Sequence, residues 1–308
     1  MSARSEWSIT APQKLTLDDP VSTLDVHIAG GTVNVVGAGT GPARLEVTQI
    51  DGHPLEVTHV GGTLRVGYPD LTWKGFPWKG FRKWLGQWDR TVHVTLTVPA
   101  GTDATVGVIG GSAVVSGLAG RADLRGVSGD FTLLRLTGPV QADTVSGRVE
   151  AQAVTGELRF HSVSGDLTVI EGSGPSVRAE SVSGDMVLDL APAPKGSDIG
   201  LTTVSGEIAI RLPHPADAEV EANTASGSLT NGFDALRVGG QWGAKRITGR
   251  LGAGRGSLKA TTVSGAIALL RRPPSEDDTD KATDTDTDTD KATATDTATT
   301  DGPEGKVL

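Results

Sequence analysis

The chain has no cysteine, which excludes disulfide bonds and cysteine-ligated metal sites. A protein without cysteine suits a reducing compartment. No stretch reaches the run of about 20 apolar residues that a helix needs to span a bilayer. The first ten residues also lack the apolar core of a secretory signal. We therefore expect a cytoplasmic protein whose contact with a membrane, if it has one, is peripheral.

Aromatic residues make up only 4% of the chain, and no apolar pattern keeps a helical period for more than two turns. The net charge is −9, but residues 273–308 hold 11 acidic residues against 3 lysines, a net of −8, which leaves −1 for the rest. A body so near neutrality lacks the basic balance of a nucleic-acid-binding protein, so we expect no nucleic-acid partner. The Thr-Asp repeats of the tail offer too little apolar surface to offset ordering entropy, which predicts disorder.

Glycine is abundant instead, at 42 of 308 residues, about twice its usual share of ~7%. Ser-Gly or Thr-Gly pairs recur about every nine residues, and every second pair belongs to a Val-Ser-Gly motif. The structural turns assigned on this basis are Ser128-Gly129, Ser146-Gly147, Ser164-Gly165, Ser183-Gly184 and Ser205-Gly206. We expect each serine hydroxyl to bond the backbone of the next coil and each glycine to supply a positive φ.

Two nine-residue units form one coil of about 18 residues, in which each unit supplies a short strand and a corner at ~3.3 Å per residue. A fixed period of this kind predicts a stack of repeats, here an all-β solenoid resembling a parallel β-helix. The valine of each motif would form an apolar ladder along the stack. The positions expected to face inward are Phe131, Val149, Leu167, Met186, Ile208, Leu229 and Ile267.

The steps between motifs lengthen after Ser183, and they place Ser205, Ser226 and Ser264 along the stack in chain order. The last step, of 38 residues, equals two coils and predicts a further corner at 247–249. Along the chain we expect an N-terminal extension at 1–12 and a β portion at 13–101, which carries an insertion at 71–90. The solenoid repeat then covers 102–271, and a disordered Thr/Asp-rich tail follows at 272–308.

The insertion at residues 71–90 concentrates aromatic and basic side chains, including four of the six tryptophans. The candidate membrane or partner contacts are Trp73, Lys74, Phe76, Trp78, Lys79, Phe81, Arg82, Lys83, Trp84 and Trp88. Tryptophan mixed with Lys and Arg is typical of a membrane-interface segment or of a protein-binding hot spot. The alternative is a cap or packed hairpin that covers an open end of the stack.

The sequence contains no constellation that points to catalysis, a cofactor or a metal. The Ser-Gly turns lack the Gly-x-Ser-x-Gly elbow of hydrolases. Asp166, Asp185 and Glu207 are expected on successive coils, but the Gly-Gly-x-Gly-x-Asp repeat of calcium-binding solenoids is absent. The six histidines show no metal-ligand spacing. We therefore predict no catalytic, cofactor-binding or metal-binding residue.

A strand at 92–98 closes with Pro-Ala-Gly and is followed by Val-Ser-Gly-Asp turns at Val127, Val163 and Val182. In these features the chain resembles the bacterial putative-adhesin family of β-strand-repeat proteins, a domain of unknown function, over residues 20–271. The resemblance implies a β-solenoid with no known catalytic residues. The family includes envelope-associated proteins, which suits the composition of residues 71–90.

We hypothesise a non-enzymatic, adhesin-like β-solenoid that serves as a binding scaffold and associates with the cell envelope or a membrane through residues 71–90. Its partner would be an anionic membrane surface or a protein that the sequence does not identify. Two alternatives stay open. One is an enzyme acting on polysaccharide, by analogy with other β-helices. The other is a purely structural protein that oligomerises through an exposed end of the stack.

Overall fold

The computed structural model describes residues 4–39, 41–69, 71, 90–193, 196–241 and 243–273. Throughout these residues the chain is all-β, with two long sheets and no helix, which confirms the predicted fold class. Within the same ranges, no helix has the length and apolar character needed to cross a membrane. By its internal contacts the chain divides between Arg272 and Pro273. The tail predicted to be disordered lies, from residue 274 on, outside the described residues.

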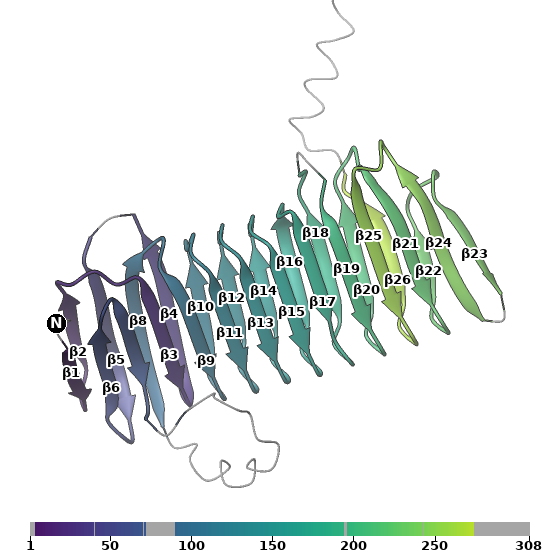
Figure 1. The fold of residues 1–308 in the computed structure, drawn as a ribbon. Helices are drawn as coiled ribbons and strands as arrows, with labels where there is room; N and C mark the ends of the chain where they lie inside the picture. Colours follow the sequence, from purple (N-terminus) through teal and green to yellow (C-terminus); the bar gives the residue numbers. More distant parts are fainter. Residues whose placement is uncertain are drawn as a thin grey trace, which may run out of the picture. The chain divides into compact units, whose positions relative to one another are not determined.

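The strands lie side by side in two sheets (Figure 1), called here the long sheet and the short sheet. In spatial order, the long sheet contains β1 (Arg4–Ile9), β6 (Leu55–Val60), β7 (Thr63–Gly67), β3 (Thr23–Ile28), β9 (Asp103–Val108), β11 (Ala122–Gly126), β13 (Val140–Thr144), β15 (Leu158–Ser162), β17 (Ser176–Glu180), β19 (Asp198–Thr203), β25 (Gly256–Thr262), β21 (Ala218–Thr224), β24 (Ala244–Leu251) and β23 (Arg237–Gln241).

The short sheet, in the same direction, contains β2 (Gln13–Leu17), β5 (Ala43–Asp51), β8 (Thr91–Pro99), β4 (Gly30–Ala38), β10 (Ser112–Ser116), β12 (Phe131–Leu134), β14 (Val149–Gln152), β16 (Leu167–Gly172), β18 (Met186–Leu190), β20 (Ile208–Leu212), β26 (Ile267–Arg271) and β22 (Leu229–Asn231). One long-sheet strand, a corner and one short-sheet strand make a coil. The strands described within residues 13–101, and β1 of the expected extension, thus belong to the same two sheets as the repeat.

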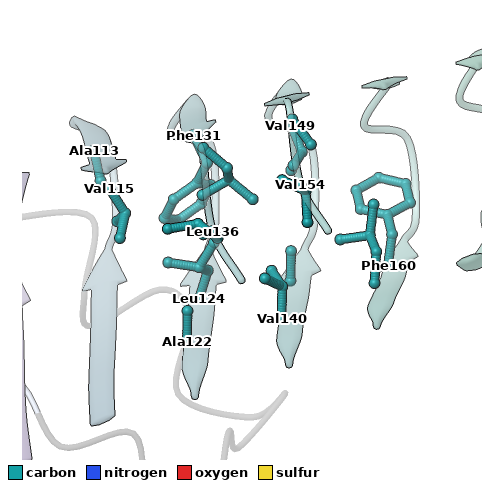
Figure 2. Packing of buried hydrophobic residues seen from close by; sticks show 14 of the residues in the cluster. Ala113, Val115, Ala122, Leu124, Phe131, Leu136, Val140, Val149, Val154 and Phe160 are labelled. Atoms are coloured by element: carbon teal, nitrogen blue, oxygen red, sulfur yellow. The ribbon is translucent and has the colours of Figure 1, made fainter. Parts of the chain in front are cut away.

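A single apolar core runs between the sheets because every second side chain of each strand points inward. Figure 2 shows this packing, with Phe131 and Phe160 among the largest buried side chains. The predicted inward ladder is confirmed, since Phe131, Val149, Leu167, Met186, Ile208 and Ile267 are at most 1% exposed and Leu229 packs against the core. No coil could bury this face alone, so the stack stabilises each coil.

The central coils pair in parallel, and the ends of the stack are antiparallel. From β9 to β19 in the long sheet, each strand pairs in parallel with the strand of the next coil. At the N-terminal end β1, β6 and β7 are antiparallel, as are β2, β5 and β8. At the other end β24 runs antiparallel to both β21 and β23. Described strands from the ends of the domain therefore cover the parallel stack.

The coils do not follow chain order near the C-terminal end. Strand β25 pairs with β19 and β21, and β26 pairs with β20 and β22, so the last coil of the sequence lies between two earlier ones. The predicted order Ser205, Ser226, Ser264 is therefore wrong. The predicted corner at 247–249 is also wrong, because Ile247 lies within β24 of an antiparallel hairpin.

The same insertion occurs at the N-terminal end. Strand β3 pairs in parallel with β7 and β9, and β4 pairs in parallel with β8 and β10. The coil that comes first in the sequence is thus held between two coils made later in the chain. At both ends of the stack, a coil from elsewhere in the sequence is thus inserted between two others: β3 and β4 at the N-terminal end, and β25 and β26 at the C-terminal end.

One corner of the coils, where the chain leaves the short sheet, contains residues in a left-handed conformation. Arg135, Ala153 and Glu171 have φ values of 52°, 53° and 55° and are spaced by 18 residues. None is glycine, although this conformation costs a residue with a side chain about 1–2 kcal/mol. The repeat tolerates the strain because the backbone N–H groups of Arg135 and Ala153 each bond a carbonyl of the following coil.

Candidate functional site

The Val-Ser-Gly motifs form the opposite corner, where the chain passes from the long sheet to the short sheet. We call this row the Val corner and define it by Val145, Val163, Val182, Val204 and Val263. Ser164 N donates to Val145 O at 2.8 Å, and similar bonds join the later coils along the row. The motif therefore builds a continuous edge that runs the length of several coils.

The glycines of the Val corner are required by close packing and not by their φ angle. None of Gly129, Gly147, Gly165, Gly184 or Gly206 has a positive φ, so that part of the prediction is wrong. A Cβ on any of them would instead collide with the carbonyl of the glycine one coil earlier. Glycine is present because only a hydrogen leaves room for the neighbouring backbone.

The serine hydroxyls of the Val corner bond to the backbone of the preceding coil. Ser128 Oγ donates to Ile109 O at 3.0 Å, and Ser146 Oγ donates to Val127 O at 3.1 Å. Ser164, Ser183 and Ser205 make the same bond at 3.3 to 3.4 Å. The neighbour in the stack is thus the coil before the serine, whereas the sequence led us to expect the coil after it.

A second hydroxyl row lies at the ends of the long-sheet strands. The N–H of the motif glycine donates to the hydroxyl three residues earlier, at 3.1 Å for Gly206 and Thr203 and at 2.9 Å for Gly184 and Ser181. These hydroxyl side chains are buried. Together with the serine hydrogen bonds, these bonds pair the hydroxyl groups of the corner, and several of its backbone N–H and C=O groups, with other groups of the protein.

The valine side chains are what the Val corner presents to its surroundings. They are 36% to 52% exposed, while the residues four positions later in the chain are buried in the core. Isolated surface valines are ordinary, but a line of them on successive coils is a continuous apolar edge. Neighbouring valines are about 4.8 Å apart along the stack, the spacing of hydrogen-bonded strands.

The carboxylates beside the Val corner have structural roles. Asp166 Oδ1 accepts a hydrogen bond from Asp185 N at 3.0 Å, and Asp185 Oδ1 accepts one from Glu207 N at 2.7 Å. Each aspartate thus supports the coil that follows it. Among the described residues, no group of three or more His, Asp and Glu side chains is placed to hold a metal ion.

The row continues toward the N-terminal end, where its character changes. Val127 and Ile109 are 7% exposed and Ala29 is 8% exposed, in contrast to the valines further along. The next connection in the row joins β7 to β8, and its described ends are Tyr68, Leu71 and Arg90. The Arg90 guanidinium lies 5.0 Å from the centre of the Tyr68 ring, and Leu71 N donates to Tyr68 O at 3.0 Å.

Leu71 and Arg90, the described residues on either side of 72–89, thus both lie on this corner, at the third coil position from the N-terminal end. The predicted contact residues all lie outside the described residues; they are Trp73, Lys74, Phe76, Trp78, Lys79, Phe81, Arg82, Lys83, Trp84 and Trp88. What the structure adds is where the segment is attached: to a side corner of the stack, away from both terminal coils.

Carboxylates with shifted pKa values occur near the C-terminal end. The pKa of Asp217 is lowered because its carboxylate accepts a hydrogen bond from Arg255 N at 2.9 Å and pairs with the Arg255 guanidinium. The pKa of Glu221 is lowered by a hydrogen bond from Asn223 and by the charge of Arg246. These pairs hold β21 to its neighbours, and their shifts have a structural cause.

Two sheets of stacked coils, with Ser-Gly turns and no helix in the described residues, define a β-solenoid of short strands. The chain belongs to the Toastrack DUF4097 family, whose sequence model matches residues 90–270. This confirms the family resemblance indicated by the Val-Ser-Gly-Asp turns. None of the curated proteins matches this chain.

Among solved structures, the crystal structure of a putative cell adhesion protein from Clostridium sporogenes is similar to this chain. The match covers 88% of this chain and 100% of that chain, at 9% sequence identity and a TM-score of 0.26.

Sequence reasoning missed that the motif valines face outward. The strand periodicity gives no signal for this, because Val163 and the inward Leu167 are separated by a turn that breaks the alternation. A count by twos through that turn places both residues on one face, and the structure places them on different faces.

Proposed function

We propose that this chain is a non-enzymatic binding scaffold that attaches to an anionic membrane surface of the cell envelope. Attachment is through the corner from which residues 72–89 depart. The observation that carries the proposal is that Leu71 and Arg90, which flank the aromatic and basic segment in the sequence, lie on the same edge of the solenoid as the apolar Val corner. A membrane-binding surface needs both an apolar face and basic residues, and this edge combines them.

The charges around the corner indicate that the electrostatic attraction to an anionic membrane comes from residues 71–90 and not from the Val corner. Asp166, Asp185 and Glu207 lie beside the Val corner and would be repelled by anionic lipid. Residues 71–90 contain five Lys and Arg against one acid, Asp89. Each basic residue near an anionic surface contributes about 1 kcal/mol, an attraction that salt screens within a Debye length.

The test is co-sedimentation of the full chain with liposomes, with and without anionic lipid, at low and high salt. We expect salt-sensitive binding to anionic vesicles only. Replacing Lys74 and Lys79 by alanine removes two charges and is expected to weaken binding by about 2 kcal/mol, roughly 30-fold. The matched control is R178A/K259A, which removes the same charge from the outer face of the long sheet and should bind normally.

The apolar part is tested separately. W78A/W84A is expected to lose most binding, because tryptophan anchors a segment at the membrane interface. V163S/V182S removes two exposed valines of the Val corner and is expected to weaken binding less, while V238S removes a valine of similar exposure on β23 and should have no effect. Binding of the W78A/W84A variant at the level of the unmodified chain would contradict the proposal.

A further inference from the structure

The two sheets have different outer faces. Strands β8, β4, β10 and β12 are neighbours in the short sheet, and none of them contains Asp, Glu, Lys or Arg. The strands of the same coils in the long sheet are β7, β3, β9 and β11, and each contains at least one such residue. In these four coils the strands of the long sheet therefore carry charges and those of the short sheet carry none.

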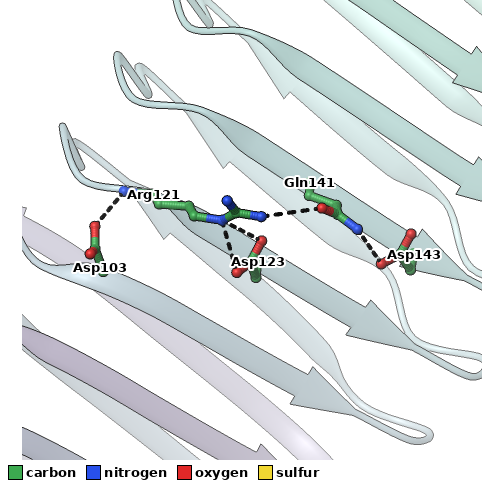
Figure 3. Close-up of polar contacts among 5 residues, drawn as sticks. All are labelled: Asp103, Arg121, Asp123, Gln141 and Asp143. Atoms are coloured by element: carbon green, nitrogen blue, oxygen red, sulfur yellow. Dashed lines mark hydrogen bonds and ion pairs between the residues drawn. The ribbon is translucent and has the colours of Figure 1, made fainter. Parts of the chain in front are cut away.

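The charged face is well suited to water. Figure 3 shows part of it, where Arg121 Nε donates to Asp123 Oδ1 at 3.0 Å and Arg121 Nη2 donates to Gln141 Oε1 at 3.3 Å. Gln141 Nε2 in turn donates to Asp143 Oδ2 at 2.9 Å, and His161 Nδ1 lies 3.2 Å from Asp143 Oδ1. Polar side chains thus bond from strand to strand across the outer face of the long sheet.

The outer face of the short sheet carries mostly threonine, serine and aliphatic side chains, with Asn34, His93 and Gln152 among them. Val187 and Leu270 are 46% and 43% exposed, and Leu134 and Ile170 are half-buried on the same face. The short strands β14, β18 and β20 bring a few charges, and two of them pair, since Arg211 Nε lies 3.6 Å from Asp189 Oδ1. The face is therefore long and regular, and most of its side chains carry no charge.

Parallel sheets are normally covered on both faces, and a sheet that meets water on one side usually has a polar outer face. The long sheet has charged side chains along its outer face, whereas the outer face of the short sheet is mostly uncharged. We propose that the outer face of the short sheet is a homodimer interface, covered by the same face of a second copy of this chain. This inference goes beyond the membrane attachment proposed above and does not depend on it.

The area of the face is large enough for a stable dimer. The nine strands from β8 to β26 extend about 43 Å at ~4.8 Å per strand, and a strand of five residues is about 16 Å long. The face thus covers about 700 Å² on each copy, or about 1,400 Å² in total, which lies within the range of specific interfaces. Two such faces would pack like the sheets of a sandwich, about 10 Å apart.

A second copy fits this face because a two-fold interface brings a surface against itself. A charged surface placed in this way meets like charges, whereas an uncharged one does not. Threonine and valine rows also pack well on an opposing pleated sheet. The outer face of the long sheet, with charges in each of its strands from β7 to β11, is the less favourable surface for self-association.

The experiment is sedimentation velocity of the full chain over a wide range of micromolar concentrations. We expect a dimer for the unmodified protein. T168K/V187K places two lysines on adjacent strands of the interface and is expected to raise the dissociation constant by about a hundredfold or more, because unpaired charges are costly to bury. Leu270→Lys, on the end strand β26 of the face, is a second variant with the same expected direction.

The matched control is T202K/T261K, which places two lysines on adjacent strands of the long sheet's outer face. It should dimerise like the unmodified protein. Thermal unfolding followed by circular dichroism checks that all variants are folded. A monomeric unmodified chain at every concentration overturns the proposal, and so does a T202K/T261K variant that dissociates as far as T168K/V187K. Liposome binding by a monomeric chain would leave the membrane proposal standing.

Discussion

Replacing Gly184 by alanine tests why glycine occupies the Val corner. A Cβ there would collide with the carbonyl oxygen of Gly165 and lie 2.7 Å from its carbonyl carbon. Carbon atoms in contact are about 3.5–4.0 Å apart, so one coil must move by about 1 Å. The shift strains the hydrogen bonds from Gly184 N to Ser181 Oγ, at 2.9 Å, and from Ser183 N to Val163 O, at 3.0 Å.

The expected cost follows from these contacts. Overpacking costs about 1–3 kcal/mol, and each weakened hydrogen bond adds about 0.5–1.5 kcal/mol. Alanine returns about 0.4–1 kcal/mol by restricting the unfolded chain. We therefore expect G184A to lower the free energy of unfolding by about 2–4 kcal/mol, measured by urea unfolding followed by far-ultraviolet circular dichroism.

Gly239 provides the control, because it lies in the exposed strand β23 and has no positive φ, and a Cβ added to it would have no other atom within 4 Å. G239A should be neutral or stabilising by about 0.5–1 kcal/mol, the usual gain when alanine replaces glycine in a strand. If G184A and G239A change stability equally, close packing of the coils is not what requires glycine at this corner.

Three further changes probe the other corner, the hydroxyl rows of the Val corner and the C-terminal end. Ala153→Gly relieves a left-handed φ of 53° and should change stability by about 0 to +1 kcal/mol, the relieved strain less the flexibility gained by the unfolded chain; a clear loss in urea unfolding would argue against strain. Thr203→Val leaves the buried Gly206 N–H without its partner and should cost about 1–3 kcal/mol, more than Ser205→Ala on the exposed side; equal losses would contradict this ranking. Asp217→Asn should remove the stability that the pair with Arg255 contributes above the unfolded pKa of Asp and that is lost as pH falls through the lowered pKa; unfolding midpoints measured from neutral to acidic pH should then fall less steeply for D217N than for the unmodified chain.

Much of the fold follows from local periodicity. The spacing of the Ser-Gly and Thr-Gly pairs gives the length of a coil, two units of about nine residues. The side chain at Phe131 and at its equivalents faces inward in every coil, because strand alternation restarts after each turn. These features depend on residues that are neighbours in sequence. The coil, its corners and its core can therefore be predicted from the sequence.

The order of the coils could not be obtained in this way. The motifs at Ser226 and Ser264 are nearly identical, with Thr-Ala-Ser-Gly in one and Thr-Val-Ser-Gly in the other. Either could stack on the coil of Ser205 as far as local pattern is concerned. Pairing between distant strands decides the matter, and the hairpin of β23 and β24 leaves one edge of β21 covered and the other edge free for β25.

The position of the motif valines was uncertain for a related reason. Val163 and Phe160 are both apolar, and sequence alone does not tell which is buried. Val163 faces outward within a turn in which the hydroxyl of Ser162 accepts the N–H of Gly165 at 2.6 Å. The conformation of this turn, which hydrophobicity does not report, accompanies an exposure that hydrophobicity alone would assign to the core.

The inserted strand pairs at both ends limit how a protein of this kind can change in length during evolution. A coil added beyond β21 and β22 would have to displace the hairpin of β23 and β24, and one added next to β20 would separate it from β26. Duplication of 18 residues between β9 and β18 meets neither obstacle, because those coils follow one another directly in the chain. Gain or loss of repeats is therefore expected in the middle of the gene, while its two ends keep their sequence.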